Sequence, residues 1–364
     1  MRANFGFNRK FPGFGSGFDI YVEDMLVKKP GESGKQSDNY PPKYPSDRYR
    51  ETHTLAPALE RSLRWLARYP GEDTFHFIHC FDVHEYRKVK RSYWDQVIEK
   101  PEKDRGQKKK LNQCLKKLKF RAGDNYVQLS FDRKKLKGKS SMNNPIVACH
   151  RMVSELMYEA RLISMENTLA RYIDALRKLG VYDRAVIIVT SDHGESLFDE
   201  KGWKGRIKRG HNKLTAKNLE IPLWIKPPGR RKGALKNNRL AGLVDLRATI
   251  GPMLGLDIGK GMGVNLLDPA DDRKGFLKFS TVNEGAGAVL PPGEICASKK
   301  QKIKETKTKW YRVYADDQWT DYHESMPDIC RSVFEHPDDK DEVISHPEIP
   351  AELIEELRAL GYVE

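Results

Sequence analysis

The sequence has few cysteines and no long apolar run, and these absences exclude several kinds of protein. No two of its five cysteines form a C-x-x-C pair, so their spacing indicates neither a zinc knuckle nor a disulfide scaffold. No segment reaches the roughly eighteen consecutive apolar residues of a membrane span. The opening MRANFGFNRKFPGFG also lacks the apolar core of a signal peptide. We therefore expect no membrane span. These features do not indicate in which cellular compartment the protein works.

Acidic residues are also fewer than basic ones: the chain has 51 aspartates and glutamates against 65 lysines and arginines, and its net charge is +14. Much of the excess lies in residues 99–121 and 132–139, inside a basic insertion at about 93–145. The simplest interpretation is a solvated, lysine-rich insertion. A concentration of this kind can also meet nucleic acid, an anionic membrane surface or a polyanionic substrate. Nothing in the sequence predicts a specific nucleic-acid partner or an oligomeric state.

Apolar periodicity predicts an α/β fold over the first three quarters of the chain. Helical spacing marks residues 54–68 and 154–180, and short apolar runs mark strands at 75–81, 185–191 and 221–226. A strand, a long helix and a second strand in this order predict a βαβ unit. We therefore expect a mainly parallel sheet flanked by helices.

The last quarter of the chain changes character. A helical pattern at 242–256 is followed by short strand-like segments at 278–282, 309–314 and about 330–334, with no helix between them. These segments predict a small antiparallel subdomain closed by a helix at 351–362. We therefore expect an α/β domain at 1–275 and an antiparallel subdomain at 276–364.

An acid and an imidazole stand side by side where the strand 185–191 ends, in VIIVTSDHGES. Functional groups of parallel α/β sheets collect just past the carboxyl ends of the strands. Asp192 and His193 can therefore supply oxygen and nitrogen ligands to a divalent metal, or take part in proton transfer. Taken alone, the same letters also describe an ordinary loop with a capping aspartate.

Two further clusters offer similar chemistry. HFIHCFDVHEY places His79, Asp82 and His84 at the end of another predicted strand, and His84 is the best functional candidate because polar residues follow it. KRGHNK contributes His211 and Lys213 in the loop before the strand 221–226. Imidazole and ammonium groups that converge on one site suit a tetrahedral oxyanion such as sulfate or phosphate.

The order of these motifs resembles the sulfatase family of the alkaline phosphatase superfamily. The resemblance lies in the series F-x-F-x-H-x-F-D-x-H-x-Y, L-x-x-L-G-x-Y-D, V-I-I-V-T-S-D-H-G-E, G-H-x-x-L and I-P-L-W-I-x-P-P-G, and it runs from about residue 70 to the C-terminus apart from the basic insertion. It implies an alkaline phosphatase-like fold and hydrolysis of sulfuric esters, such as aryl sulfates or sulfated glycans. It also implies an anionic substrate.

The same resemblance implies roles for individual residues. Asp192 and His193 would bind the divalent metal, which is usually Ca²⁺ in sulfatases. His84, His211 and Lys213 would contact the ester oxygens or assist the leaving group. Asp82 and Glu195 fit supporting or capping roles better than direct ligation. Lys201 departs from the family pattern, because many relatives carry histidine there.

The family's nucleophile motif, C/S-x-P-x-R, which yields formylglycine, does not occur in these 364 residues. Its paired metal-binding aspartates on the first strand are also not recognised. We therefore expect a first strand and a nucleophile segment to be missing, a weakly held Ca²⁺ and no hydrolysis by the chain as given. Three explanations stay open: a fragment of a longer sulfatase, a binding module that grips polyanions through its insertion, and a phosphodiesterase-like or phosphoethanolamine transferase-like relative.

Overall fold

The computed structural model divides the chain into two compact units, residues 1–185 and 186–364. It describes residues 2–3, 22–23, 55–84, 86–99, 105–130, 144–201, 207–210, 215–229, 239–257, 263–271, 277–281, 285–290, 295–303, 306–315, 318–320 and 323–331.

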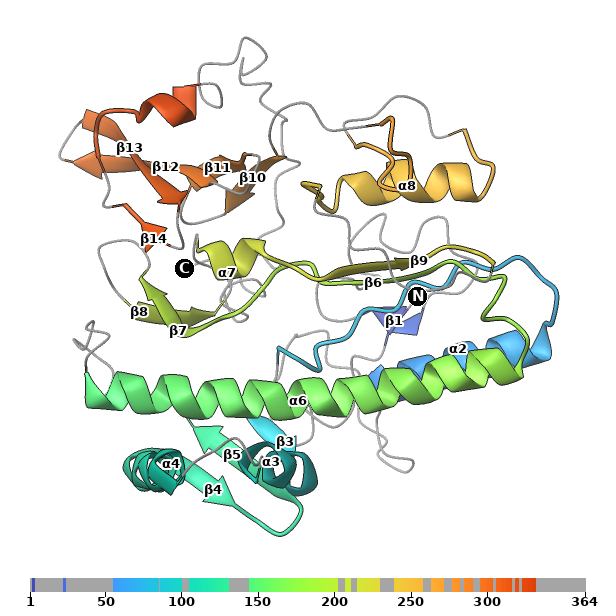
Figure 1. Ribbon diagram of the computed structural model, residues 1–364, viewed down its shortest axis with the longest axis horizontal. Helices are drawn as coiled ribbons and strands as arrows, with labels where there is room; N and C mark the ends of the chain where they lie inside the picture. The colour runs from blue at the N-terminus through green and yellow to red at the C-terminus, as the bar shows by residue number, and fades with distance from the viewer. Residues whose placement is uncertain are drawn as a thin grey trace, which may run out of the picture. The chain divides into compact units, whose positions relative to one another are not determined.

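A single long helix, α6 (Pro145–Lys178), organises the first unit (Figure 1). The Asn144 side chain accepts a hydrogen bond from the backbone N–H of Ile146 at 3.0 Å, and Pro145 takes the first helical position, where its missing N–H costs nothing. Past the other end, Gly180 adopts a φ of +67°, the left-handed conformation in which glycine commonly ends a helix. The predicted start at residue 154 was too late, because this cap precedes the apolar stripe.

Helix α2 (Leu55–Arg68) packs on α6 and confirms the helix predicted there. Leu55, Ala58 and Leu59 are buried on the packed side. Ser62 is also buried, and its hydroxyl lies 2.7 Å from the Tyr172 hydroxyl of α6. A polar contact therefore joins the two helices in addition to their apolar packing.

The described parts of the basic insertion fold together with the residues just before it. Strands β3 (Lys88–Lys90), β5 (Tyr126–Ser130) and β4 (Lys119–Ala122) form an antiparallel sheet in that order. Helices α3 (Arg91–Ile98) and α4 (Arg105–Lys117) pack with this sheet against α6, on the side shown below that helix in Figure 1. Its buried core is apolar and comprises Val89, Trp94, Val97, Leu111, Val127 and Leu129.

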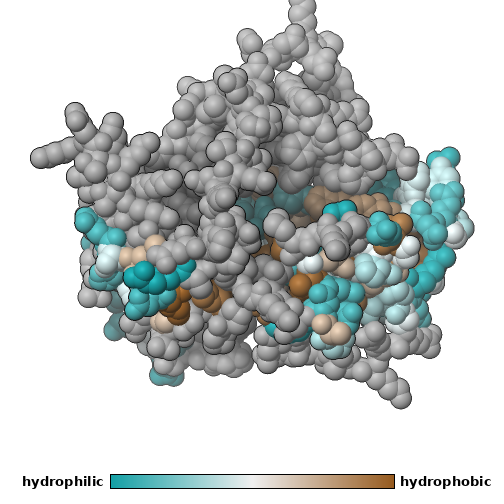
Figure 2. Space-filling model, turned by 90° about the horizontal axis from the view of Figure 1, so that it is seen from above, coloured by the Kyte–Doolittle hydropathy of each residue, from teal (hydrophilic) through white to brown (hydrophobic). Residues whose placement is uncertain are grey.

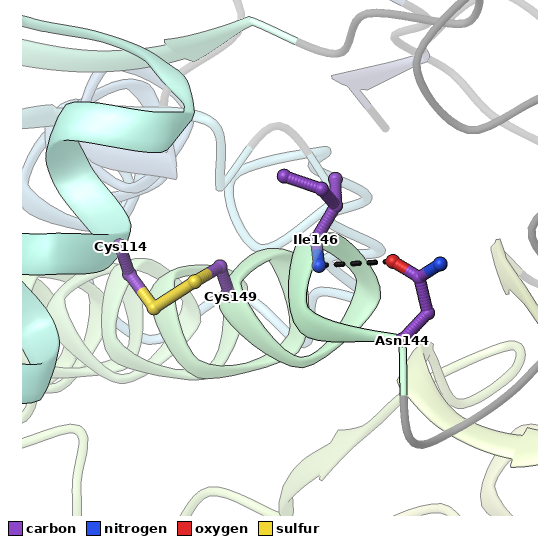
Figure 3. The surroundings of a disulfide bond; sticks show 4 residues. All are labelled: Cys114, Asn144, Ile146 and Cys149. Atoms are coloured by element: carbon purple, nitrogen blue, oxygen red, sulfur yellow. Dashed lines mark hydrogen bonds between the residues drawn. A yellow bond between two sulfur atoms is a disulfide. The ribbon is translucent and has the colours of Figure 1, made fainter.

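Two disulfides correct the prediction that the cysteines form no disulfide framework. Cys114 of α4 is bonded to Cys149 of α6 (Figure 3), and Cys296 is bonded to Cys330. Each pair is separated by 35 or 34 residues along the chain. Only tertiary packing brings such distant cysteines together, so their spacing in the sequence did not indicate the bonds.

In the second unit, β6 (Ile187–Thr190) pairs with β9 (Leu223–Lys226). Both strands were predicted, but their pairing is antiparallel. Within residues 75–81, only Ile78 forms a bridge. The described parallel pair is a short one in the first unit, β1 (Arg2–Ala3) with β2 (Val22–Glu23). A mainly parallel central sheet therefore stays a prediction.

Between β6 and β9 the chain forms a pair of antiparallel strands and a short helix. Strands β7 (Ser196–Lys201) and β8 (Ile207–Gly210) pair antiparallel, with a shift of register between Leu197 and Lys201. Helix α7 (Ala216–Leu219) follows. The described residues between β6 and β9 contain no long crossover helix, and this suits their antiparallel pairing.

Helix α8 (Asp245–Met253) follows β9, within the helical pattern predicted at 242–256. Asp245 is fully buried, and its carboxylate accepts hydrogen bonds from the backbone N–H of Gly242 and of Val264 at 2.8 and 2.9 Å. A buried carboxylate with such partners fixes a loop against the helix.

The last sheet is antiparallel throughout and agrees with the predicted C-terminal antiparallel strands. Its strands run in the order β10 (Leu277–Thr281), β11 (Gly285–Val289), β12 (Ile295–Ile303), β13 (Thr306–Ala315) and β14 (Gln318–Trp319). A small core of Ala288, Cys296, Val313 and Cys330 holds it together. The strand predicted at about 330 was wrong at its start, because Asp328–Cys330 is a 3₁₀ turn. The predicted helix 351–362 lies outside the described residues.

Some large apolar residues remain at the surface. In the second unit, Trp224, Leu254 and Leu256 are more than half exposed. Figure 2 shows one face of the molecule, where hydrophobic residues (brown) reach the surface among hydrophilic ones (teal). Isolated residues of this kind are ordinary on folded proteins. None of the described helices combines the length and the apolar character needed to cross a membrane.

Candidate functional site

The acid–imidazole pair lies in the loop that joins β6 to β7. The Oδ1 atom of Asp192 accepts a hydrogen bond from the backbone N–H of His193 at 3.0 Å, and the same oxygen lies 3.8 Å from Nε2 of the His193 ring. The Asp192 side chain is 56% exposed and that of His193 is 26% exposed. The two side chains are therefore adjacent and open to solvent.

The His193 ring is oriented by the backbone. Its Nδ1 atom lies 2.8 Å from the carbonyl oxygen of Gly194, and that contact is a hydrogen bond when Nδ1 carries the proton. In the neutral ring Nε2 then keeps its lone pair, which is the form that ligates metals. The 3.8 Å between Nε2 and the Asp192 carboxylate is short enough for both atoms to reach one cation, so this pair fits a divalent metal.

The loop itself is held closely against α7. The backbone N–H of Gly194 donates to the carbonyl of Asn218 at 2.9 Å. A Cβ atom on Gly194 would lie 1.8 Å from the carbonyl oxygen of Lys217, so only glycine fits. Thr190 adds a hydrogen bond from its hydroxyl to the carbonyl of Pro222 at 2.9 Å. The backbone on both sides of the pair is thus anchored.

Asp82, in the first unit, has a structural role. Its Oδ2 atom accepts a hydrogen bond from the backbone N–H of Leu55, the first residue of α2, at 2.6 Å. Its own carbonyl accepts one from Nε of Arg161 in α6, also at 2.6 Å. Of the two roles predicted for Asp82, supporting or capping, these contacts show a capping one, and they link both helices to the segment that precedes His84.

His84 lies against an aromatic neighbour, with its ring centroid 5.6 Å from that of Phe81, and it is partly buried. It belongs to the first unit, whereas Asp192 and His193 belong to the second. Their meeting in one site therefore stays a prediction. The other two predicted site residues, His211 and Lys213, lie outside the described residues.

A polar network in the first unit was not predicted. Nδ1 of His76 lies 2.7 Å from the Ser62 hydroxyl, which also contacts the Tyr172 hydroxyl. Burial lowers the pKa of His76 below its ordinary value of 6.5 and raises the pKa of Tyr172 above 10.0. Ser62 at a buried position of an amphipathic helix was the only signal in the sequence, and it does not reveal its partners.

No group of three or more His, Cys, Asp or Glu side chains among the described residues is arranged to hold a metal. If a metal binds at the Asp192–His193 pair, its remaining ligands would come from beyond the described part of the chain or from solvent.

Comparison with known proteins identifies similar proteins and a family to which the chain can be assigned. Lipoteichoic acid synthases of Staphylococcus aureus strains USA300, NCTC 8325 / PS 47 and COL are each 35% identical over 132 residues. The similar stretch covers 35% of this chain and 18% of each synthase, so the chain matches less than a fifth of the length of these relatives. The family model for sulfatases matches residues 3–256, well over half of the chain. That family binds a divalent metal and has the alkaline phosphatase-like α/β fold, and this protein belongs to the sulfatase family of the alkaline phosphatase superfamily.

Proposed function

We propose that this chain handles anionic esters at a divalent-metal site, with sulfuric ester hydrolysis as the reaction of its family. The observation that carries the proposal is the Asp192–His193 pair, 3.8 Å apart and solvent-accessible after β6, inside the stretch that matches the sulfatase model. An exposed carboxylate and an imidazole nitrogen at this separation can bind the same divalent cation.

In this proposal Asp192 and His193 hold the metal, for which Ca²⁺ is the first candidate. The metal supplies a positive charge that stabilises the ester oxygens. His193 is kept in the ligating tautomer by its contact with the Gly194 carbonyl. His84, His211 and Lys213 donate hydrogen bonds to the ester oxygens or protonate the leaving group.

The chain as given is proposed to lack turnover. A C/S-x-P-x-R motif, from which the family makes its formylglycine nucleophile, is not found in the 364 residues. Calcium takes about six to eight oxygen ligands, so two protein ligands hold it weakly. We therefore expect measurable but weak metal binding without ester hydrolysis.

Phosphoryl chemistry is the second candidate, and one observation favours it. The similar proteins of Staphylococcus aureus are named lipoteichoic acid synthases. A phosphodiesterase-like or phosphoethanolamine transferase-like activity would use the same metal and the same oxyanion contacts. The two candidates differ in the ester that they accept.

Metal binding tests the proposal directly. Calorimetric titration with Ca²⁺ is expected to give a Kd on the order of 10⁻⁴ to 10⁻³ M, or weaker. Asp192→Asn should weaken binding by about tenfold or more, since a ligand is lost. Asp73→Asn, an equal change at an exposed aspartate of the first unit, is the control and should leave the Kd unchanged. Equal Kd values for the wild type and Asp192→Asn would refute the metal assignment.

Turnover assays separate the two candidates. Hydrolysis of p-nitrophenyl sulfate and of bis-p-nitrophenyl phosphate is measured with Ca²⁺ and with Mn²⁺, and the sulfate is expected to stay intact. Sulfate turnover that disappears in Asp192→Asn would contradict the expected lack of a nucleophile. Turnover of the phosphodiester alone would select the second candidate.

A further inference from the structure

Helix α4 carries a dense set of positive charges. No acidic residue occurs between Arg105 and Gly123. Every cation of α4 is exposed, and these cations are Arg105, Lys108, Lys109, Lys110, Lys116 and Lys117.

The cations are arranged on the side of α4 that faces away from the protein. Leu111 and Cys114 are the buried residues of the helix. With 3.6 residues per turn, Arg105, Lys109 and Lys116 project from the opposite side, spaced by about 6 and about 10 Å along the axis. The other lysines flank this row. We call Arg105, Lys109 and Lys116 the α4 basic face.

These charges do not stabilise the helix that carries them. The first turn of α4 contains no acid, although the positive end of a helix favours one. Arg105 and Lys109 are like charges at i and i+4, which repel. Among the described residues, no ion pair is recorded for any cation of α4. The helix is held instead by its buried side and by the Cys114–Cys149 bond to α6.

The residues around the α4 basic face limit the chemical classes of partner that it can bind. Within the described parts of 86–130, no large apolar side chain is strongly exposed, so no anchor for a lipid surface is present there. Helix α4 contains no aromatic residue. Among the neighbouring rings, Trp94 packs against Phe120 with centroids 5.1 Å apart, and the Lys88 ammonium lies 4.9 Å from the centre of the Tyr126 ring. The face itself thus offers charge without platforms for stacking bases.

The disulfides indicate the setting in which this face works. Such bonds persist in oxidising environments and are rare in the reducing cytosol. Two of them lie in this chain, and one anchors α4 itself. A linear polyanion outside the cytosol is more often a polysaccharide than a nucleic acid.

We propose that the α4 basic face is a docking surface for an anionic polysaccharide, held rigidly on α6 by the Cys114–Cys149 disulfide. The surface belongs to the first unit, whereas the Asp192–His193 pair belongs to the second, and the surface needs no metal. It binds the acid or ester groups of a polymer in succession along the helix. This binding goes beyond the proposed ester chemistry, since it stands whether or not the chain hydrolyses anything.

Heparin is the probe for a direct test, carried out in EDTA so that metal binding plays no part. The triple variant Arg105→Gln, Lys109→Gln, Lys116→Gln is compared with Arg68→Gln, Arg171→Gln, Lys178→Gln, which removes the same charge from exposed positions of α2 and α6. We expect the first variant to bind heparin about tenfold more weakly at 0.1 M salt, with a shallower dependence of affinity on salt, because fewer counterions are displaced. The control variant should lose less than threefold.

Additional control measurements decide between the possible results. Circular dichroism and thermal melting establish that both variants fold. Asp192→Asn should bind heparin as the wild type does, so that a failed metal site and a failed docking surface give different results. Equal losses in the two triple variants would show that net charge alone drives binding and would overturn the proposal. A 20-base-pair DNA duplex bound more tightly than heparin through the same three residues would overturn the polysaccharide assignment.

Discussion

Two regions of the molecule contain an aspartate and a histidine close together in sequence, and the structure treats them differently. Near His84, the Asp82 carboxylate accepts the first backbone N–H of α2, and its carbonyl is held by Arg161. In the other region, the Asp192 side chain is 56% exposed, and its carboxylate accepts a hydrogen bond from the backbone N–H of His193.

The difference shows that the residue types do not decide the role of an acid–imidazole pair. Asp82 lies beside the start of a helix, where backbone N–H groups have no partner within the helix. Its carboxylate accepts a hydrogen bond from one of these groups and so stabilises the fold. Asp192 lies in a loop whose backbone is already anchored through Gly194 and Thr190. Its carboxylate is more than half exposed and can therefore be reached from solvent. Three substitutions test this contrast.

The largest effect is expected from Gly194→Ala. The new Cβ would stand 1.8 Å from the Lys217 carbonyl oxygen, so the backbone of the loop or of α7 must move. We expect a loss of about 2 to 3 kcal/mol in the free energy of unfolding and a loss of Ca²⁺ binding. Chemical denaturation and calorimetry measure both. Gly123→Ala is the control, because its Cβ would meet only an ordinary contact at 3.4 Å. A fully stable Gly194→Ala protein would show that the loop is not fixed as described.

A smaller effect is expected from Asp82→Ala. It leaves the N–H of Leu55 without its acceptor and should cost about 1 to 2 kcal/mol of stability, as the loss of a helix cap does. Asp192→Ala should change stability by less than about 0.5 kcal/mol, as exposed substitutions do. Ca²⁺ affinity should respond in the opposite way, falling only in Asp192→Ala. Equal stability losses in the two variants would remove the contrast between the regions.

The smallest effect is a pH dependence from His76. Burial lowers its pKa in the folded state below 6.5, so the unfolded state binds the proton more tightly. Its contribution to stability is therefore complete above pH 6.5 and is lost as the pH falls from there toward the folded pKa. Urea denaturation between pH 8 and 5 should show a steeper decline for the wild type than for His76→Gln. Parallel curves would show that His76 takes no part.

Local patterns predicted many of the elements. Helices α2 and α6, strands β6 and β9 and the antiparallel strands of the last sheet follow from apolar spacing and turn residues, which act over a few positions. Within the helix predicted at 154–180, an apolar stripe of Leu162, Met165, Leu169, Ile173 and Leu176 was expected to be buried; Leu176 is buried, but Leu162 is 38% exposed. The deeper burial lies nearer the start of the helix, where Val153 and Met157 are fully buried. Periodicity identifies an apolar stripe but not how much of it a neighbour will cover.

Of the candidate site, the sequence identified the adjacency of Asp192 and His193, and for Asp82 it favoured a supporting or capping role over direct metal ligation. The sequence did not indicate the close approach of Gly194 to Lys217. It also did not indicate the network of Ser62, His76 and Tyr172. These features join segments that are distant along the chain. The predicted roles of His84, His211 and Lys213 remain predictions.

By itself, then, the sequence determined the family, most local elements and the acid–imidazole motif, since each depends on the order of nearby residues. Tertiary structure decided which cysteines pair, how β6 and β9 are oriented, and that Asp82 serves folding while Asp192 stays exposed. The physical reason is that a hydrogen bond, a disulfide or a desolvated side chain depends on what lies beside it in space, and distant segments supply those neighbours.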